Sequence, residues 1–291
     1  MAIERGDDDV TDLLTIEDLR VSFPGPGFRA QPKEVLHGIS MQIAQGETLG
    51  IVGESGSGKT TLGRAVLGLV KVASGSVRLE GEEISQATAK RRRQLSGDIQ
   101  VVFQDPYTSL NPAMTVSDIL TEPLIAQGRS KADATGRIVG LLDRVNLPRS
   151  AMQKYPREFS GGQRQRVAIA RALALSPKLI VCDEPVSALD LSTQSRVMDL
   201  FIELQEQTGV AYLFISHDLA VVRHISHRVA VLYQGEIVET GPARKVTLDP
   251  DDSYTRRLML AAPVSDPLLQ RERRADRLLL SGTGDDEITA I

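Results

Sequence analysis

The stretch that decides the fold runs from residue 53 to residue 60 and reads Gly53-Glu54-Ser55-Gly56-Ser57-Gly58-Lys59-Thr60. It has the pattern of a phosphate-binding loop, in which two glycines with four residues between them precede a lysine and then a serine or threonine. The apolar residues 48–52 before it predict a short buried strand, and the spacing of apolar residues in 61–70 predicts a helix. A strand, a loop and a helix start aim backbone N–H groups at one anion. We therefore interpret the stretch as a phosphate site and not as a turn without a ligand.

Each position of this loop has a chemical role in that interpretation. Glycine permits backbone angles and a close approach to an anion that a Cβ would forbid. Lys59 would reach the outer phosphates, and the Thr60 hydroxyl would ligate Mg²⁺. The nucleotide-binding residues predicted here are Gly53, Glu54, Ser55, Gly56, Ser57, Gly58, Lys59, Thr60 and Thr61.

Composition excludes several classes of protein. The 291 residues are 41% hydrophobic and 25% charged, which is typical of one large globular domain with appendages. No apolar run reaches the roughly 20 residues of a membrane-spanning helix, and the acidic residues 1–10 are unlike a secretory signal, so we expect a cytoplasmic chain. The single cysteine, Cys182, excludes a disulfide framework and a metal site of several cysteines. A net charge of −4 without tryptophan argues against nucleic acid as the main partner.

Signals for strands and helices alternate along the chain, which indicates a parallel sheet with crossover helices. The segments that predict strands by alternating or continuous apolar residues include 13–23, 35–43, 48–52, 98–103, 179–182 and 210–215. Residues 106–175 have helical spacing broken by prolines, so we expect a helical subdomain there. The four cations at 90–93 are interpreted as a solvated helix face, with lipid head groups or nucleic acid as the alternative contact.

Two carboxylates follow the apolar strand 179–182. Asp183 and Glu184 stand at its carboxyl end, where ligands bind in open parallel sheets. Beside a phosphate loop, the first carboxylate typically holds Mg²⁺, here Asp183. Glu184 would then be the general base that orients and deprotonates the attacking water. Two acids that merely end a strand in solvent are the alternative, and the phosphate loop makes it the weaker one.

Three further polar stretches are ambiguous when each is taken alone. Ser160-Gly161-Gly162-Gln163 opens a helix with a good N-cap and exposed N–H groups, so it is either a second anion site or an ordinary capped helix. Gln104 follows the strand 98–103, and His217 follows the strand 210–215. An isolated glutamine or histidine at a strand end is more often structural than catalytic.

In order along the chain, these stretches resemble the nucleotide-binding subunit of ATP-binding cassette (ABC) transporters. The ordered set is the phosphate loop, Gln104, Ser160-Gly161-Gly162-Gln163, Asp183-Glu184, the D-loop-like Ser187-Ala188-Leu189-Asp190, and His217. Any one of them would be a weak signal, but the ordered set is specific. The resemblance covers roughly residues 13–265.

Within that family, the chain is similar to the ATPases of oligopeptide and dipeptide importers. The similar segments are Phe103-Gln104-Asp105-Pro106, Ser109-Leu110-Asn111-Pro112, Tyr155-Pro156, Ser216-His217-Asp218 and the region 250–263 around Tyr254-Thr255. One departure is the absence of cysteine after Cys182, where members of this subgroup often carry a cysteine cluster. Any role tied to that cluster is therefore not carried over.

The resemblance implies a role for each matching residue. Glu184 is the implied base, His217 holds the γ-phosphate and the water, Lys59 binds phosphate, and Gln104 contacts Mg²⁺ or the water and senses a membrane partner. The implied metal ligands are Thr60, Gln104 and Asp183. The implied contacts with a nucleotide held by the opposite subunit come from Ser160, Gly161, Gly162, Gln163 and Asp190. Phe23 is the candidate for stacking on adenine, with Phe28 second and core packing as the alternative.

The fold class that follows is α/β, with a P-loop NTPase (ABC ATPase) core of mostly parallel sheet, an antiparallel β subdomain and an inserted helical subdomain. We expect a flexible leader at 1–12, an ATPase domain at 13–240 with the helical subdomain at about 106–175, a C-terminal extension at 241–270 like that of oligopeptide transporters, and a disordered tail at 271–291.

The resemblance also implies partners. ATP and Mg²⁺ would bind between two ATPase subunits, with a different second chain favoured and a homodimer as the alternative. Two transmembrane permease subunits, and indirectly a solute-binding protein, would complete an importer, with this chain peripheral on the cytoplasmic face of the membrane and no nucleic acid bound. Oligopeptides or dipeptides are the expected cargo, and nickel or glutathione are alternatives. A soluble ABC ATPase that acts on nucleic acid or ribosomes, and a non-catalytic partner subunit, are weaker alternatives.

Overall fold

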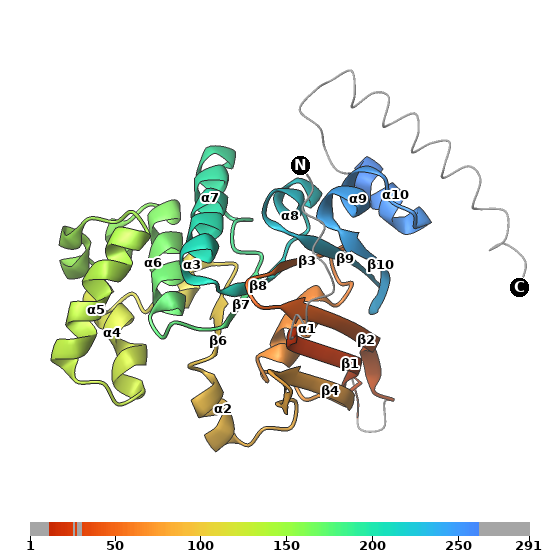
Figure 1. The fold of residues 1–291 in the computed structure, drawn as a ribbon, viewed down its shortest axis with the longest axis horizontal. Coiled ribbons are helices and arrows are strands. Elements are labelled where there is room, and N and C mark those ends of the chain that lie inside the picture. Colours follow the sequence, from red (N-terminus) through yellow and green to blue (C-terminus); the bar gives the residue numbers. More distant parts are fainter. Residues whose placement is uncertain (1–11, 26, 28–30, 262–291) are drawn as a thin grey trace, which may run out of the picture.

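Two sheets organise the chain in the computed structural model, which describes residues 12–25, 27 and 31–261 (Figure 1). The six-stranded sheet has the order β10-β9-β3-β8-β7-β6, and its neighbouring strands run parallel except for β9 and β10. Its strands are β3 (Thr48–Val52), β6 (Ile99–Val102), β7 (Leu179–Asp183), β8 (Ala211–Ile215), β9 (Arg228–Tyr233) and β10 (Glu236–Pro242). The strands β3 and β8 are buried throughout, which explains their continuous apolar sequences.

The second sheet is antiparallel and has the order β2-β1-β4-β5. Its strands are β1 (Asp12–Phe23), β2 (Lys33–Ala44), β4 (Ser74–Leu79) and β5 (Glu82–Glu83). Buried and exposed residues alternate along β1 and β2 because only one face packs on the core. The predicted fold class, a mostly parallel sheet with an antiparallel subdomain and inserted helices, is confirmed.

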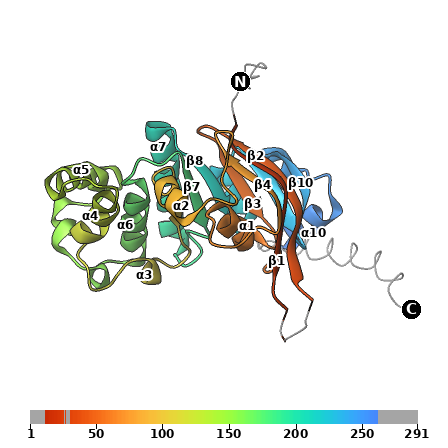
Figure 2. The ribbon, with the colours of Figure 1, turned by 90° about the horizontal axis from the view of Figure 1, so that it is seen from below.

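The helices fall into groups around these sheets. Their bounds are α1 (Lys59–Val66), α2 (Ala89–Leu95), α3 (Pro106–Ser109), α4 (Val116–Ala126), α5 (Lys131–Arg144), α6 (Gly161–Leu173), α7 (Leu191–Thr208), α8 (Leu219–Ile225), α9 (Ala243–Leu248) and α10 (Ser253–Ala261), with 3-10 turns η1 (Arg149–Gln153) and η2 (Pro156–Glu158). The helices α4 and α5 lie at the end of the molecule away from β1 and β2 (Figures 1 and 2). Among the described residues, none of these helices has the length and apolar character to cross a membrane.

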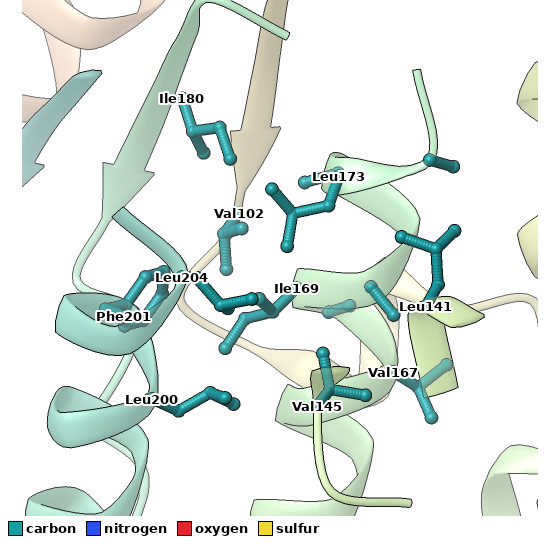
Figure 3. Close-up of a cluster of buried hydrophobic side chains, with 14 of the residues drawn as sticks. Val102, Leu141, Val145, Val167, Ile169, Leu173, Ile180, Leu200, Phe201 and Leu204 are labelled. Carbon is teal, nitrogen blue, oxygen red and sulfur yellow. The ribbon is translucent and has the colours of Figure 1, made fainter. Parts of the chain in front are cut away.

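A continuous apolar cluster joins the inserted helices to the central sheet. Ile169 on α6 and Phe201 on α7 face Val102 and Ile180, which project from β6 and β7 (Figure 3). Leu141 of α5 extends the same cluster outward. Because these side chains are fully or nearly fully buried, α6 and α7 are fixed against the strands that end at the candidate site.

A second cluster fixes the helix that follows the phosphate loop. Leu62 and Val66 of α1 are buried together with Ile16 of β1 and Ile51 of β3, so α1 packs against residues of both sheets. The helix is shorter than the predicted 61–70. It ends at Val66 because Gly68 takes a left-handed φ of 69°, and Leu69 is left 61% exposed.

The cationic run at 90–93 is only partly a solvated helix face. Lys90 and Arg93 of α2 are exposed, and Arg91 pairs with Glu82. Arg92 instead donates hydrogen bonds to the carbonyls of Val66 and Ile84, and so closes the end of α1. The expectation of four solvated cations is therefore wrong for Arg92, because a tertiary contact recruits one side chain of the run.

Candidate active site

The phosphate loop connects β3 to α1 and is shaped by close contacts that only glycine permits. A Cβ on Gly53 would lie 2.1 Å from the Leu232 carbonyl oxygen, and one on Gly58, where φ is 107°, would lie 2.8 Å from Leu36 Cδ2. The Ser57 hydroxyl is buried and has no hydrogen-bond partner among the described residues. A glycine cradle with an unpaired hydroxyl fits a ligand that brings its own acceptors, such as a phosphate.

Lys59 lies inside its own loop. Its ammonium group donates hydrogen bonds to the carbonyl oxygens of Gly53 and Glu54, each at 2.8 Å, and the residue is only 5% exposed. Burial lowers the pKa of Lys59, while the carboxylates of Glu184 and Asp183 act in the opposite direction. The cation is thus held at the mouth of the loop by two neutral acceptors, which an incoming phosphate could replace with charged ones.

Thr60 and Asp183 come together although 123 positions separate them. The Thr60 hydroxyl donates to Asp183 Oδ1 at 3.0 Å. Burial raises the pKa of Asp183, and the hydrogen bond from Thr60 opposes that shift. A hydroxyl and one carboxylate oxygen are hard ligands, and Mg²⁺ is usually held by few protein ligands together with water and phosphate oxygens. The pair therefore fits Mg²⁺, and no cluster of three His, Cys, Asp or Glu side chains that could hold a metal occurs in the described part of the chain.

Glu184 is the meeting point of three strand ends. It follows β7 in a left-handed conformation with φ of 49°, and its backbone N–H donates to the Ile215 carbonyl at 3.0 Å. Gln104 Nε2, after β6, donates to Glu184 Oε2 at 3.3 Å, and His217 Nδ1, after β8, lies 3.0 Å from the same oxygen. The Glu184 side chain is 19% exposed, so it is held in place and still reaches solvent.

The turn at Ser160–Gln163 is a closed capping box. The Ser160 hydroxyl accepts from the Gln163 N–H at 3.3 Å, and Gln163 Oε1 accepts from the Ser160 N–H at 3.0 Å. Gly161 and Gly162 adjoin Leu189 and Thr193, which flank Asp190 at the start of α7. Within the described residues, no hydrogen bond or ion pair joins this turn to the phosphate loop, whereas Gln104, Asp183, Glu184 and His217 are brought together.

The first candidate for the adenine contact, Phe23, lies at the far end of β1. Phe23 pairs with Lys33 of β2 and is 39% exposed. Two positions earlier, Val21 pairs with Leu36, the residue whose side chain lies against Gly58 of the phosphate loop. Phe23 is thus an exposed aromatic residue on β1, two positions from the Val21–Leu36 pair that lies near the phosphate loop. Its stacking role remains a prediction. Phe28 lies outside the described residues.

Two contacts of the loop were missed by the sequence analysis. The Glu54 N–H donates to the Tyr254 hydroxyl at 3.1 Å, and the Gly235 N–H donates to the Ser57 carbonyl at 3.0 Å. The Gln234-Gly235 pair lies between β9 and β10, and no local sequence pattern shows which residues such a turn contacts. Tyr254 is 200 positions from Glu54, so only the fold brings them together.

Comparison with known proteins agrees with this geometry. The sequence profile described as ABC transporter matches residues 36–187, which is more than half of the chain. The chain belongs to the ABC transporter family. The match begins in β2 and runs through the phosphate loop, Gln104, Ser160 and Glu184, so it includes most of the site described above.

Curated relatives within the ABC family are similar over most of this chain. The "Glutathione import ATP-binding protein GsiA" of Salmonella paratyphi A is 49% identical over 267 residues, and that of Escherichia coli K12 is 48% identical over the same length. Each alignment covers 90% of this chain and 43% of the relative. The chain therefore spans less than half of the length of these relatives.

Solved structures share the ABC ATPase fold. The structure of cbiO1 from Clostridium perfringens, described as part of the ABC transporter complex cbiONQ, has a TM-score of 0.73 at 28% identity and covers 82% of this chain and 92% of its own. The ATP-binding cassette MJ0796, in a dimeric post-hydrolysis state bound to ADP and Pi, has a TM-score of 0.70 at 29% identity. The match covers 79% of this chain and 99% of the MJ0796 chain.

Proposed function

We propose that this chain is the ATP-hydrolysing subunit of a membrane importer. The observation that carries the proposal is the placement of Glu184 Oε2 between Gln104 and His217, next to the Thr60–Asp183 pair and the phosphate loop. A base, two polar groups that orient it, and a metal-binding pair are the parts that phosphoryl transfer to water requires.

In the proposed reaction, a water oxygen attacks the γ-phosphorus of ATP, the bond to the β-phosphate oxygen breaks, and ADP and phosphate leave. Glu184 takes the water proton. Its Oε2 is occupied by Gln104 and His217, and no hydrogen bond to Oε1 occurs among the described residues, so Oε1 is the oxygen available to the water. Lys59 offsets the charge of the outer phosphates. Mg²⁺, when bound by Thr60, Asp183 and Gln104, would neutralise developing charge on the phosphate oxygens.

We propose that the working unit contains two ATPase chains. Ser160, Gln163, Asp190 and the neighbouring Leu191 are all exposed, so this surface is accessible to a second chain. The dimeric structural neighbour supports such a pairing. The nucleotide would lie between the phosphate loop of one chain and the Ser160 turn of the other, and the second chain can be identical or different.

A groove next to Gln104 supports the proposal that this chain binds a membrane partner. It has a volume of about 240 Å³ and is lined mainly by apolar residues, which include Leu67, Leu69, Leu95, Val101 and Phe103. Phe103 directly precedes Gln104, so a helix of a permease subunit placed in this groove would lie beside a residue that contacts Glu184. We propose two permease chains and a peripheral position on the cytoplasmic face of the membrane. The segments 13–240 and 241–270 would be the ATPase domain and its extension.

We propose a small peptide as the cargo. The similarity to oligopeptide and dipeptide importer ATPases favours this class. The relatives with 48–49% identity are named for import of glutathione, which is itself a tripeptide. A binding protein that presents the peptide to the permeases would be an indirect partner of this chain.

The substitution Glu184→Gln tests the proposed base. It keeps the size of the side chain and removes the proton acceptor, so we expect the rate of ATP hydrolysis to fall at least about 100-fold while the affinity for Mg-ATP changes little. Phosphate release and equilibrium binding of ATP measure the two effects. Glu203→Gln, on the exposed face of α7, is the matched control and should retain full hydrolysis. Full hydrolysis by E184Q would overturn the assignment of the base.

A further inference from the structure

The C-terminal helix α10 is attached directly to the phosphate loop. The backbone N–H of Glu54, the second residue of the loop, donates to the Tyr254 hydroxyl oxygen at 3.1 Å. Tyr254 is 5% exposed, so this hydrogen bond lies largely out of water. Buried hydrogen bonds are geometrically demanding, because a displaced partner leaves an unpaired polar group.

The position of the Tyr254 ring is fixed from several sides. The ring packs on Tyr233 with centroids 4.1 Å apart and planes tilted by 36°. It belongs to an apolar cluster with Val52, the residue just before the loop, and Val246 of α9. Asp252 caps α10 by accepting hydrogen bonds from the N–H groups of Tyr254 and Thr255. The hydroxyl therefore has little freedom to move away from Glu54.

A second contact from the C-terminal part of the chain holds the other side of the loop. The Gly235 N–H, in the turn between β9 and β10, donates to the Ser57 carbonyl at 3.0 Å. Tyr233 closes that turn on one side and stacks on Tyr254. The loop is thus held at Glu54 and at Ser57 by two connected elements.

We propose that Tyr254 is a positioning residue for the phosphate loop, through which α10 sets the affinity of the site for the triphosphate of ATP. This inference rests on the proposed ATP site. A phosphate site binds tightly when its N–H groups are held in place before the ligand arrives, since less ordering is then needed on binding. The Tyr254 hydroxyl supplies such a restraint at the start of the loop. Burial raises the pKa of its phenol, so the hydroxyl remains neutral at physiological pH.

The substitution Tyr254→Phe removes the hydroxyl and keeps the ring. In the presence of Mg²⁺, we expect the dissociation constant of a non-hydrolysable ATP analogue to rise about 2- to 10-fold, the range set by one hydrogen bond. Calorimetry on the full chain measures this constant. The amide of Glu54 should also exchange with deuterium faster in Y254F. Tyr233→Phe is the matched control. It removes a hydroxyl from the other ring of the stacked pair, where the partner is the Gln234 side chain and not the loop, and should change neither value.

The two measurements separate this inference from the proposed function. Unchanged affinity together with unchanged Glu54 exchange in Y254F overturns the positioning role, even if the wild-type chain hydrolyses ATP. A wild-type chain that binds no analogue overturns the proposed function instead. Should Y254F fail to fold, hydrogen exchange of the Glu54 amide in the wild-type chain still tests the positioning role. A Glu54 amide that exchanges as fast as that of the exposed Ser55 would show that the hydrogen bond to Tyr254 does not form in solution.

Discussion

Gly162 sets the distance between α6 and α7 by the absence of a single atom. A Cβ at this position would lie 2.3 Å from Thr193 Cγ2, whereas a Cβ on the neighbouring Gly161 would lie at an ordinary 3.4 Å from Leu189 Cδ2. The two glycines therefore have different reasons to be present. Gly162 allows the Ser160 turn to approach α7, whereas Gly161 has room for a methyl group.

We expect Gly162→Ala to lower the free energy of unfolding by about 1–3 kcal/mol because the added methyl overlaps the Thr193 side chain. Urea unfolding followed by circular dichroism measures the change. Gly161→Ala, the same substitution one position earlier, should be nearly neutral. In the double variant G162A/T193S the clashing methyl is gone, so most of the lost stability should return. A double variant no more stable than G162A would show that the overlap is not the cause.

At the scale of an element, the start of α7 depends on one charged cap. Asp190 Oδ1 accepts hydrogen bonds from the Thr193 N–H at 3.0 Å and the Ser192 hydroxyl at 2.7 Å. These hydrogen bonds lower the pKa of Asp190 from 3.8 to about 2. The helix dipole favours the same charged form. A folded-state pKa below the ordinary value means that the carboxylate stabilises the fold above pH 3.8, and that this contribution is lost as the pH falls toward 2.

Asp190→Asn isolates this charge, because asparagine is an equally good N-cap that does not titrate. At neutral pH we expect the variant to unfold at a lower temperature or urea concentration than the wild type. The gap should narrow progressively below about pH 5 and close only below pH 2, where the carboxyl is protonated in the folded chain as well. Unfolding of the nucleotide-free chain at a series of pH values measures it. A gap of constant size across this range would contradict a charge-dependent cap.

At the scale of the whole molecule, the two proposed halves of the ATP site do not meet within the described part of the chain. Glu184, Asp183 and the phosphate loop form one, and the turn at Ser160 with Asp190 forms the other. The Ser160 turn is held by its capping box and by the buried cluster around α6 and α7, and the phosphate loop is held by its contacts with Tyr254 and Gly235. We infer that completion requires a second chain and not a rearrangement within one.

The E184Q variant provides the test of this pairing, since bound ATP should persist and hold two chains together. We expect E184Q with Mg-ATP to elute as a dimer in size-exclusion chromatography with light scattering. Adding Ser160→Asp to E184Q keeps a good N-cap but places a negative charge beside the γ-phosphate of the bound ATP. The two charges repel, so the dissociation constant of the dimer should rise at least about tenfold. Ser160→Asn keeps the cap without the charge and should have a much smaller effect. A Ser160→Asp dimer as stable as its parent would argue against this turn as the second half-site.

Patterns within a few neighbouring residues predicted much of the fold. The apolar strands around the phosphate loop and before Asp183, the alternating strands of the antiparallel sheet and the helical insertion all have local signals, and the fold class is confirmed. The family is confirmed as well, because its motifs are short contiguous stretches. The C-terminal helices α9 and α10 were not predicted, since prolines and charged residues there hide a weak apolar pattern.

The sequence by itself predicted a nucleotide site that begins at Gly53, and it placed Asp183, Glu184, Gln104 and His217 at strand ends. Only the tertiary structure decided which of these side chains touch, because contact depends on strand order. The neighbours β6, β7 and β8 bring Gln104 and His217 to one oxygen of Glu184. In the same way, only the packing of α10 shows that Tyr254 holds Glu54. A hydrogen bond between residues 200 positions apart leaves no periodic or local trace in a sequence.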